Sequence, residues 1–100
     1  MITDKQFEDS FTAAGGWFFL TNVEIIFNWH GDKVSLIDEL FEKGFDNKKT
    51  GTKTRVSGCL RIIENGRGKE ALMKIRNSIR INQLHPEARD IANLLLTKYY

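Results

Sequence analysis

The sequence predicts an all-α fold, a compact single-domain bundle of five or six short helices. A chain of 100 residues has the size of one domain. Hydrophobic residues make up 41% of it and recur at helical spacing in successive segments. Glycines, a single proline and N-capping residues separate these segments. We find no repeat and no low-complexity tract, so we expect one domain over residues 1–100.

The first helix is predicted from its capping residues. Thr3 followed by Gln6 matches a capping box, in which each side chain bonds the backbone amide of the other residue. Gly15-Gly16 ends the apolar pattern, and glycine tolerates the left-handed conformation found at helix ends. We therefore expect a helix over residues 4–14.

Residues 17–20 form a short apolar run, which we expect to be an extended segment or a buried connector. Four residues are too few for periodicity to separate these two structures. Thr21 followed by Glu24 matches a second capping box, so the second helix is expected to begin there and to end at Gly31. Asp32 is then the predicted N-cap of the third helix.

The fourth helix is predicted to start at Thr50 or Thr52 and to run to Glu64. Asn65-Gly66 is the expected C-terminal cap, because glycine is common just past a helix end. Its apolar positions follow one face of a helix: Val56, Cys59, Leu60 and Ile63.

Two further helices complete the predicted bundle. The fifth follows residues 66–68 and runs to about Ile81, and a closing helix over residues 86–98 opens with Pro86 at a first helical position. The expected buried positions are Ala71, Leu72, Ile75 and Ile79 in the fifth helix and Ala88, Ile91, Leu94 and Leu95 in the last.

The formal net charge of +2 conceals a strongly asymmetric charge distribution. Residues 1–47 carry three cations and nine anions, a charge of −6, whereas residues 48–80 carry ten cations and two anions, a charge of +8. Such a basic segment favours a polyanion or an acidic protein as partner. The acidic half would neutralise the basic half within one chain or across a head-to-tail homodimer, or would present a separate surface to a basic protein.

The polar face of the fourth helix is the most informative feature. Thr54, Ser57, Gly58 and Arg61 recur at i, i+3, i+4 and i+7, opposite the apolar stripe. Glycine inside a helix costs about 0.5–1 kcal/mol relative to alanine, so its presence on an exposed face indicates close approach to another surface. Hydroxyl and guanidinium groups bind phosphates and base edges, as a helix laid into a nucleic-acid groove requires. The alternative is that Gly58 packs against a helix of the same chain and that the cations are solvated.

These patterns define a candidate nucleic-acid-binding surface on the fourth and fifth helices. Its members are Lys48, Lys49, Lys53, Thr54, Arg55, Ser57, Gly58, Arg61, Arg67, Lys69, Arg76 and Arg80. We expect Thr54, Ser57 and Arg61 to make base-edge or close backbone contacts and the other cations to contact phosphates.

The sequence contains no recognisable catalytic or metal site. Cys59 lies on the apolar stripe, which favours a small buried hydrophobe over a thiolate nucleophile. His30 and His85 lie near predicted helix ends, and with one cysteine they are too few for a structural zinc site. We therefore expect neither an enzyme nor a bound cofactor or metal.

We expect a small intracellular regulatory protein that binds nucleic acid, DNA rather than RNA. The alternative is a protein-interaction module, such as a phage or mobile-element inhibitor or accessory subunit, that binds a larger nucleic-acid-processing machine. A lone cysteine and the lack of an apolar leader favour the cytoplasm. No apolar run approaches the roughly 20 residues of a membrane span, so no membrane association is expected.

Overall fold

The computed structural model describes all 100 residues and confirms an all-helical fold, with seven helices rather than five or six. The helices are α1 (Asp4–Ala14), α2 (Gly16–Phe27), α3 (Lys33–Phe41), α4 (Lys49–Glu64), α5 (Gly68–Arg76), α6 (Ile79–Leu84) and α7 (Ala88–Tyr99). The additional helix arises because the segment expected to form one fifth helix forms two, α5 and α6. None of the seven is both long and apolar enough to cross a lipid bilayer.

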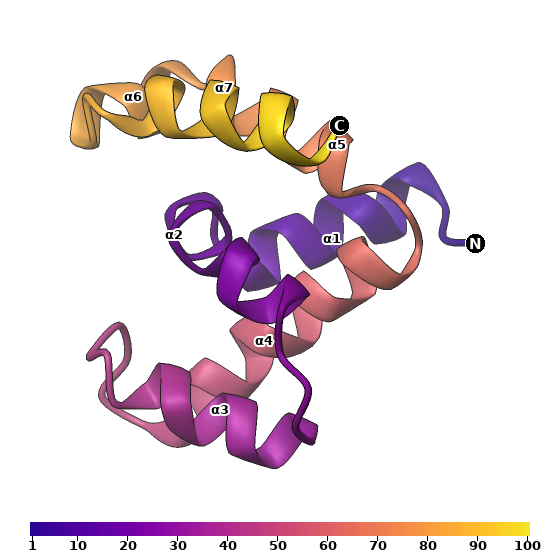
Figure 1. The fold of residues 1–100 in the computed structure, drawn as a ribbon, viewed down its shortest axis with the longest axis vertical. Helices are drawn as coiled ribbons and strands as arrows, with labels where there is room; N and C mark the ends of the chain where they lie inside the picture. Colours follow the sequence, from indigo (N-terminus) through magenta and orange to yellow (C-terminus); the bar gives the residue numbers. More distant parts are fainter.

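The central element of the bundle is α4. It packs against α1, α2, α3 and α5, and its interface with α1 is the most extensive in the molecule. In Figure 1, α1 and α4 cross the middle of the molecule, α3 lies at one end, and α5, α6 and α7 form the other end. The buried apolar side chains of these layers form one cluster.

The capping residues predicted for α1 and α3 are confirmed. The Thr3 hydroxyl accepts a hydrogen bond from the Gln6 amide at 3.1 Å, and the Gln6 side chain accepts one from the Thr3 amide at 2.9 Å. The Asp32 carboxylate accepts one from the Ser35 amide at 2.7 Å. These bonds satisfy amide groups that the first turn of a helix leaves unpaired.

The expectation for residues 17–20 is wrong, because these residues belong to α2. Gly15 has φ +79°, a conformation that suits glycine, and it lets α2 begin at the next residue after α1 ends. Thr21 is not an N-cap, since its hydroxyl donates to the Trp17 carbonyl at 2.9 Å within the helix. Because α2 packs against α1, α4, α5 and α7, burial of its apolar residues outweighs the local capping pattern.

The break between α5 and α6 is stabilised by two side chains. The Ser78 hydroxyl accepts a hydrogen bond from the Ile81 amide at 3.1 Å and so caps α6. The Asn82 side-chain amide donates to three carbonyls at the end of α5 and in the following turn. The break turns Ile79, which was expected to be buried, towards solvent with 76% exposure.

The closing helix begins later than predicted, and most of its expected inner face is buried: Ala88 and Leu95 are buried as predicted, and Ile91 packs against the core. The helix spans Ala88–Tyr99 rather than residues 86–98. Ala92 is buried, whereas Leu94, expected on the inner face, is 66% exposed. The small alanine side chains let α7 lie close to α5, with which it forms a large interface.

Candidate functional site

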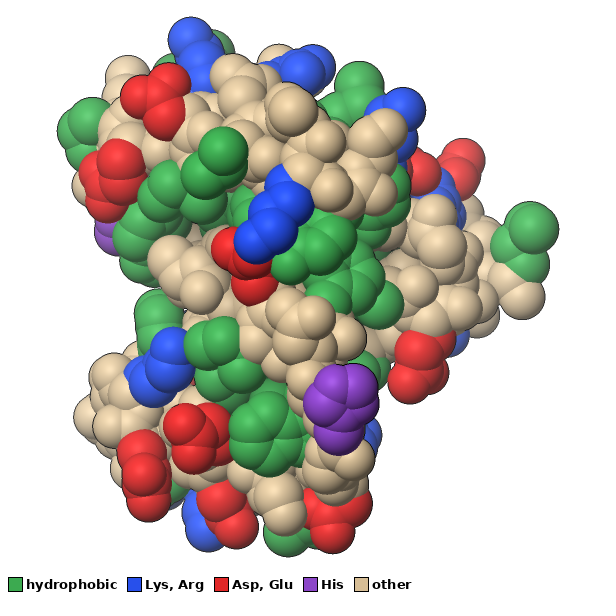
Figure 2. All heavy atoms as spheres, in the orientation of Figure 1, with side chains coloured by type: hydrophobic (Ala, Val, Ile, Leu, Met, Phe, Trp, Pro, Cys, Tyr) green, Lys and Arg blue, Asp and Glu red, His purple; other side chains and the backbone are tan.

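The basic segment does not form one continuous positive surface. On the face shown in Figure 2, Lys and Arg side chains are interspersed with Asp and Glu. Four of the ten cations in residues 48–80 form ion pairs with carboxylates of residues 1–47: Lys49–Asp38 (2.6 Å), Arg55–Asp46 (3.0 Å), Arg67–Asp4 (2.9 Å) and Lys74–Glu8 (3.0 Å). The acidic half therefore neutralises part of the basic half within one chain.

The Arg55 side chain is held by contacts within the chain. Its Nε donates to both carboxylate oxygens of Asp46, at 3.0 and 3.2 Å, and its Nη1 donates to the Ala14 carbonyl at 3.1 Å. That carbonyl lies at the C-terminus of α1, where a helix leaves carbonyls unpaired. The guanidinium also lies 5.6 Å from the centroid of the Phe18 ring. Arg55 thus ties α1, α2 and the loop before α4 together.

Arg67 is held in a similar way at the start of α5. Its guanidinium pairs with Glu70 at 2.6 Å and with Asp4 at 2.9 Å, and these bonds raise the pKa of Arg67. It also lies 4.3 Å from the centroid of the Phe7 ring. The side chain is only 15% exposed, so it joins α5 to α1 and has little surface to offer a phosphate.

The expectation that Gly58 lies on an exposed face is wrong. Gly58 is buried where α4 crosses α1. A Cβ atom at this position would lie 2.6 Å from the Ser10 carbonyl oxygen and 2.9 Å from the Ala14 amide nitrogen. The glycine allows two helices of the same chain to pack in backbone contact, which was the alternative considered for it.

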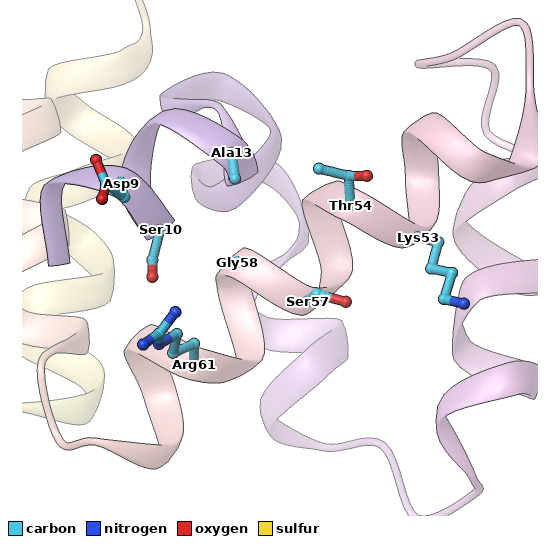
Figure 3. Close-up of a pocket in the computed structure, with 8 residues that line it drawn as sticks. All are labelled: Asp9, Ser10, Ala13, Lys53, Thr54, Ser57, Gly58 and Arg61. Carbon is cyan, nitrogen blue, oxygen red and sulfur yellow. The ribbon is translucent and has the colours of Figure 1, made fainter. Parts of the chain in front are cut away.

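Beside this crossing, α1 and α4 enclose a polar groove of about 440 Å³, called here the α1–α4 groove. Its lining residues are Asp9, Ser10 and Ala13 from α1 and Lys53, Thr54, Ser57, Gly58 and Arg61 from α4 (Figure 3). Arg61 lies at the end near Asp9 and Ser10, and Lys53 lies at the opposite end. The groove brings together the polar face of α4 that the sequence spacing predicted.

Three groove side chains, called here the α4 row, have no hydrogen-bond or ion-pair partner within the chain: Lys53, Ser57 and Arg61. They are spaced at i, i+4 and i+8, so successive members lie on the same side of α4, about 6 Å apart along its axis. The α4 row therefore offers two positive charges and one hydroxyl group to a ligand in the groove.

The other polar side chains of the groove already form hydrogen bonds or ion pairs within the chain. The Thr54 hydroxyl donates to a backbone carbonyl one turn earlier at 3.1 Å, and the Ser10 hydroxyl does the same at 2.8 Å. The Asp9 carboxylate is paired with Lys5 at 2.9 Å, which offsets its negative charge. These groups leave the α4 row as the free donors of the groove.

The remaining predicted cations lie outside the groove. Those without a carboxylate partner are Lys48 at the start of α4, Lys69 in the first turn of α5, Arg76 at the end of α5 and Arg80 in α6. The structure therefore gathers five of the twelve predicted site residues in one groove and distributes the others over three helices.

Sequence reasoning missed an apolar pocket between α3 and α4. It has a volume of about 260 Å³ and is lined by Val34, Ile37, Asp38, Lys49, Thr50 and Lys53. Val34 follows the helical spacing of a core residue, yet it is 68% exposed. The only signal in the sequence was this apolar residue one turn before Ile37, and nothing local indicates how α3 lies against α4. Lys53 lines both cavities, so the pocket adjoins the α1–α4 groove.

Nucleophilic and metal-binding groups are not gathered at either cavity. Cys59 is fully buried, and this burial raises the pKa of its thiol to about 12. Such a thiol carries almost no thiolate at neutral pH. No three His, Cys, Asp or Glu side chains converge in a way that would hold a metal ion.

The α4 row has the chemistry of an anion-binding site, with charged and neutral donors that share one groove. Comparison with protein families, curated proteins and solved structures finds no match for this chain. The function proposed below is therefore argued from the chemistry of the protein surface.

Proposed function

We propose that this protein binds nucleic acid, with DNA as the first ligand to test, and acts as a small non-enzymatic regulator. The observation that supports this most directly is the α4 row, because Lys53, Ser57 and Arg61 share one groove and lack partners within the chain. Phosphate oxygens accept hydrogen bonds from all three groups, and the two cations also offset phosphate charge.

The proposed contact set is smaller than the one expected from the sequence. Its inner members are the α4 row: Lys53, Ser57 and Arg61. Thr54 lines the same groove, but its hydroxyl already donates to a backbone carbonyl within α4. Its outer members attract the polyanion from a distance: Lys48, Lys69, Arg76 and Arg80. Lys49 also belongs to the outer set, because an exposed ion pair such as Lys49–Asp38 contributes only about 0–1 kcal/mol. Arg55, Gly58 and Arg67 are left out because they hold helices together.

A second candidate is a protein-interaction module that binds an acidic surface of a larger nucleic-acid-processing machine. One observation favours it: carboxylates already bind four cations of the basic segment within the chain. The carboxylates of an acidic peptide could bind the cations of the α4 row in the same way. Direct binding measurements with nucleic acid separate the two candidates.

Fluorescence anisotropy of labelled oligonucleotides over a salt series tests the proposal. The logarithm of affinity should fall linearly with the logarithm of salt concentration, by about 0.9 per phosphate neutralised on a duplex and about 0.7 on a single strand. The double variant Lys53→Gln/Arg61→Gln should make this slope shallower by about 1.4–1.8, because two phosphate contacts are lost.

The matched control is Lys43→Gln/Arg89→Gln, which removes the same charge from exposed positions outside the groove. We expect it to keep the wild-type slope. Equal slopes for the two double variants would contradict the placement of the site. If duplex DNA, single-stranded DNA and RNA all fail to bind at low salt, the acidic protein partner becomes the better account.

A further inference from the structure

The position of α4 in the bundle disfavours its entry into the major groove of a duplex. Four helices pack around it, and α1 lies in backbone contact with it at Gly58. The major groove of B-DNA is about 12 Å wide and admits one helix, and a helix with its side chains is itself about 10–12 Å across. A pair of helices in backbone contact is therefore wider than the groove, which disfavours entry with α4 leading.

The α4 row instead suits the backbone of a single strand. The row runs along one side of α4, and α1 flanks it at the end where Arg61 lies near Asp9 and Ser10 (Figure 3). A single strand is narrower and more flexible than a duplex, so it can follow this row past α1. Successive members of the row lie about 6 Å apart along the helix axis, a spacing comparable with that of consecutive phosphates in a strand.

The apolar pocket between α3 and α4 provides a place for a base. Bases in a duplex are stacked inside, whereas a single strand can turn one out onto a protein surface. The pocket adjoins the row at Lys53 and presents the exposed side chain of Val34 with Ile37 beside it. A base there would cover this apolar surface, and the Asp38 carboxylate at the same pocket can accept a hydrogen bond from the amino group of a cytosine.

We infer that the ligand is a single-stranded nucleic acid, whose phosphates follow Lys53, Ser57 and Arg61 and one of whose bases fills the apolar pocket between α3 and α4. This inference rests on the proposed nucleic-acid binding and defines the form of its ligand. It differs from the expectation of a helix laid into a duplex groove, because that expectation required α4 to project from the molecule.

Anisotropy titrations of the full chain with one labelled oligonucleotide, alone and annealed to its complement, test the inference. The single strand should bind about tenfold more tightly than the duplex, the order of magnitude expected from covering an exposed valine side chain. Val34→Glu removes this apolar surface and places a negative charge at the pocket, and it should weaken single-strand binding about tenfold. Leu94→Glu on α7 is the matched control, because Leu94 is similarly exposed and lies outside both cavities; it should leave the affinity unchanged.

The outcomes distinguish this inference from the function on which it rests. A duplex that binds as tightly as the single strand, or more tightly, would overturn the inference and leave the proposed function in place. Unchanged single-strand affinity in Val34→Glu, with helicity intact by circular dichroism, would overturn it as well. The absence of binding to both forms would overturn the inference and the proposed function together.

Discussion

Gly58 sets the distance between α1 and α4. A Cβ atom there would lie 2.6 Å from the Ser10 carbonyl oxygen, so Gly58→Ala must push the two helices apart. Overpacking of this kind costs about 1–3 kcal/mol, which exceeds the gain of up to about 1 kcal/mol in helix propensity. We therefore expect the free energy of unfolding, measured with denaturant, to fall by about 1–2 kcal/mol.

Ser57→Ala is the control for this substitution, because it changes the neighbouring residue on the groove side of α4. Its effect on the free energy of unfolding should stay within about 0.5 kcal/mol. A Gly58→Ala protein as stable as the wild type would show that α1 can move away without cost. A binding defect in a Gly58 variant would reflect displaced helices rather than a lost contact with the ligand.

Cys59 makes the stability of the protein sensitive to alkaline pH. Burial raises the pKa of its thiol from 9.0 to about 12, so the native state keeps a proton that the unfolded chain loses. Stability should therefore fall as the pH rises above 9.0 towards 12, by about 1.4 kcal/mol per pH unit from this group alone. Denaturant unfolding at a series of pH values across this range measures the effect. Cys59→Ala should show a shallower loss, and an unchanged slope would contradict the account.

At the scale of elements, prediction succeeded where the determining contacts are local. Thr3 and Asp32 cap their helices through residues three positions away, and such spacings are visible in a sequence. The start of α2 depends on contacts distant in sequence, and the end of α5 depends on side chains in the following turn that the apolar spacing does not reveal. Burial against four helices draws residues 17–20 into α2, and the Asn82 amide reaches back to the carbonyls of α5. Neither interaction leaves a periodic pattern.

The contact between α2 and α7 should weaken in acid. Lys98 pairs with Glu24 at 2.6 Å and the Tyr99 hydroxyl donates to the same carboxylate at 2.8 Å. These bonds lower the pKa of Glu24 below its ordinary value of 4.5. A group whose pKa is depressed in the folded state contributes stability above the unfolded value, and that contribution is lost as the pH falls through the folded value.

Thermal unfolding of Glu24→Gln over a range of acidic pH tests this contact. The variant should be less stable than the wild type above pH 4.5, and the difference should shrink as the pH falls below that value. Glu64→Gln is the control, because Glu64 is exposed and forms no ion pair. A constant difference between Glu24→Gln and wild type at all pH values would contradict the assignment.

At the scale of the whole molecule, the chain folds its two oppositely charged halves against each other. Sequence spacing predicted that Thr54, Ser57 and Arg61 share a face, and the structure places all three in the α1–α4 groove. The sequence did not reveal that Arg55 and Arg67 form hydrogen bonds and ion pairs within the chain. The carboxylate and carbonyl groups that bind them lie up to 64 positions away. The proposed binding surface is therefore smaller than the charge distribution suggested.

The α4 row is where we propose that a nucleic acid binds. Titration of ¹⁵N-labelled protein with an unlabelled single-stranded oligonucleotide, followed by amide chemical shifts, tests this directly. We predict that the largest changes occur along Lys53, Ser57 and Arg61 and at Val34, with α7 little affected. Saturable binding with the largest changes in α6 and α7 and none along α4 would contradict the account.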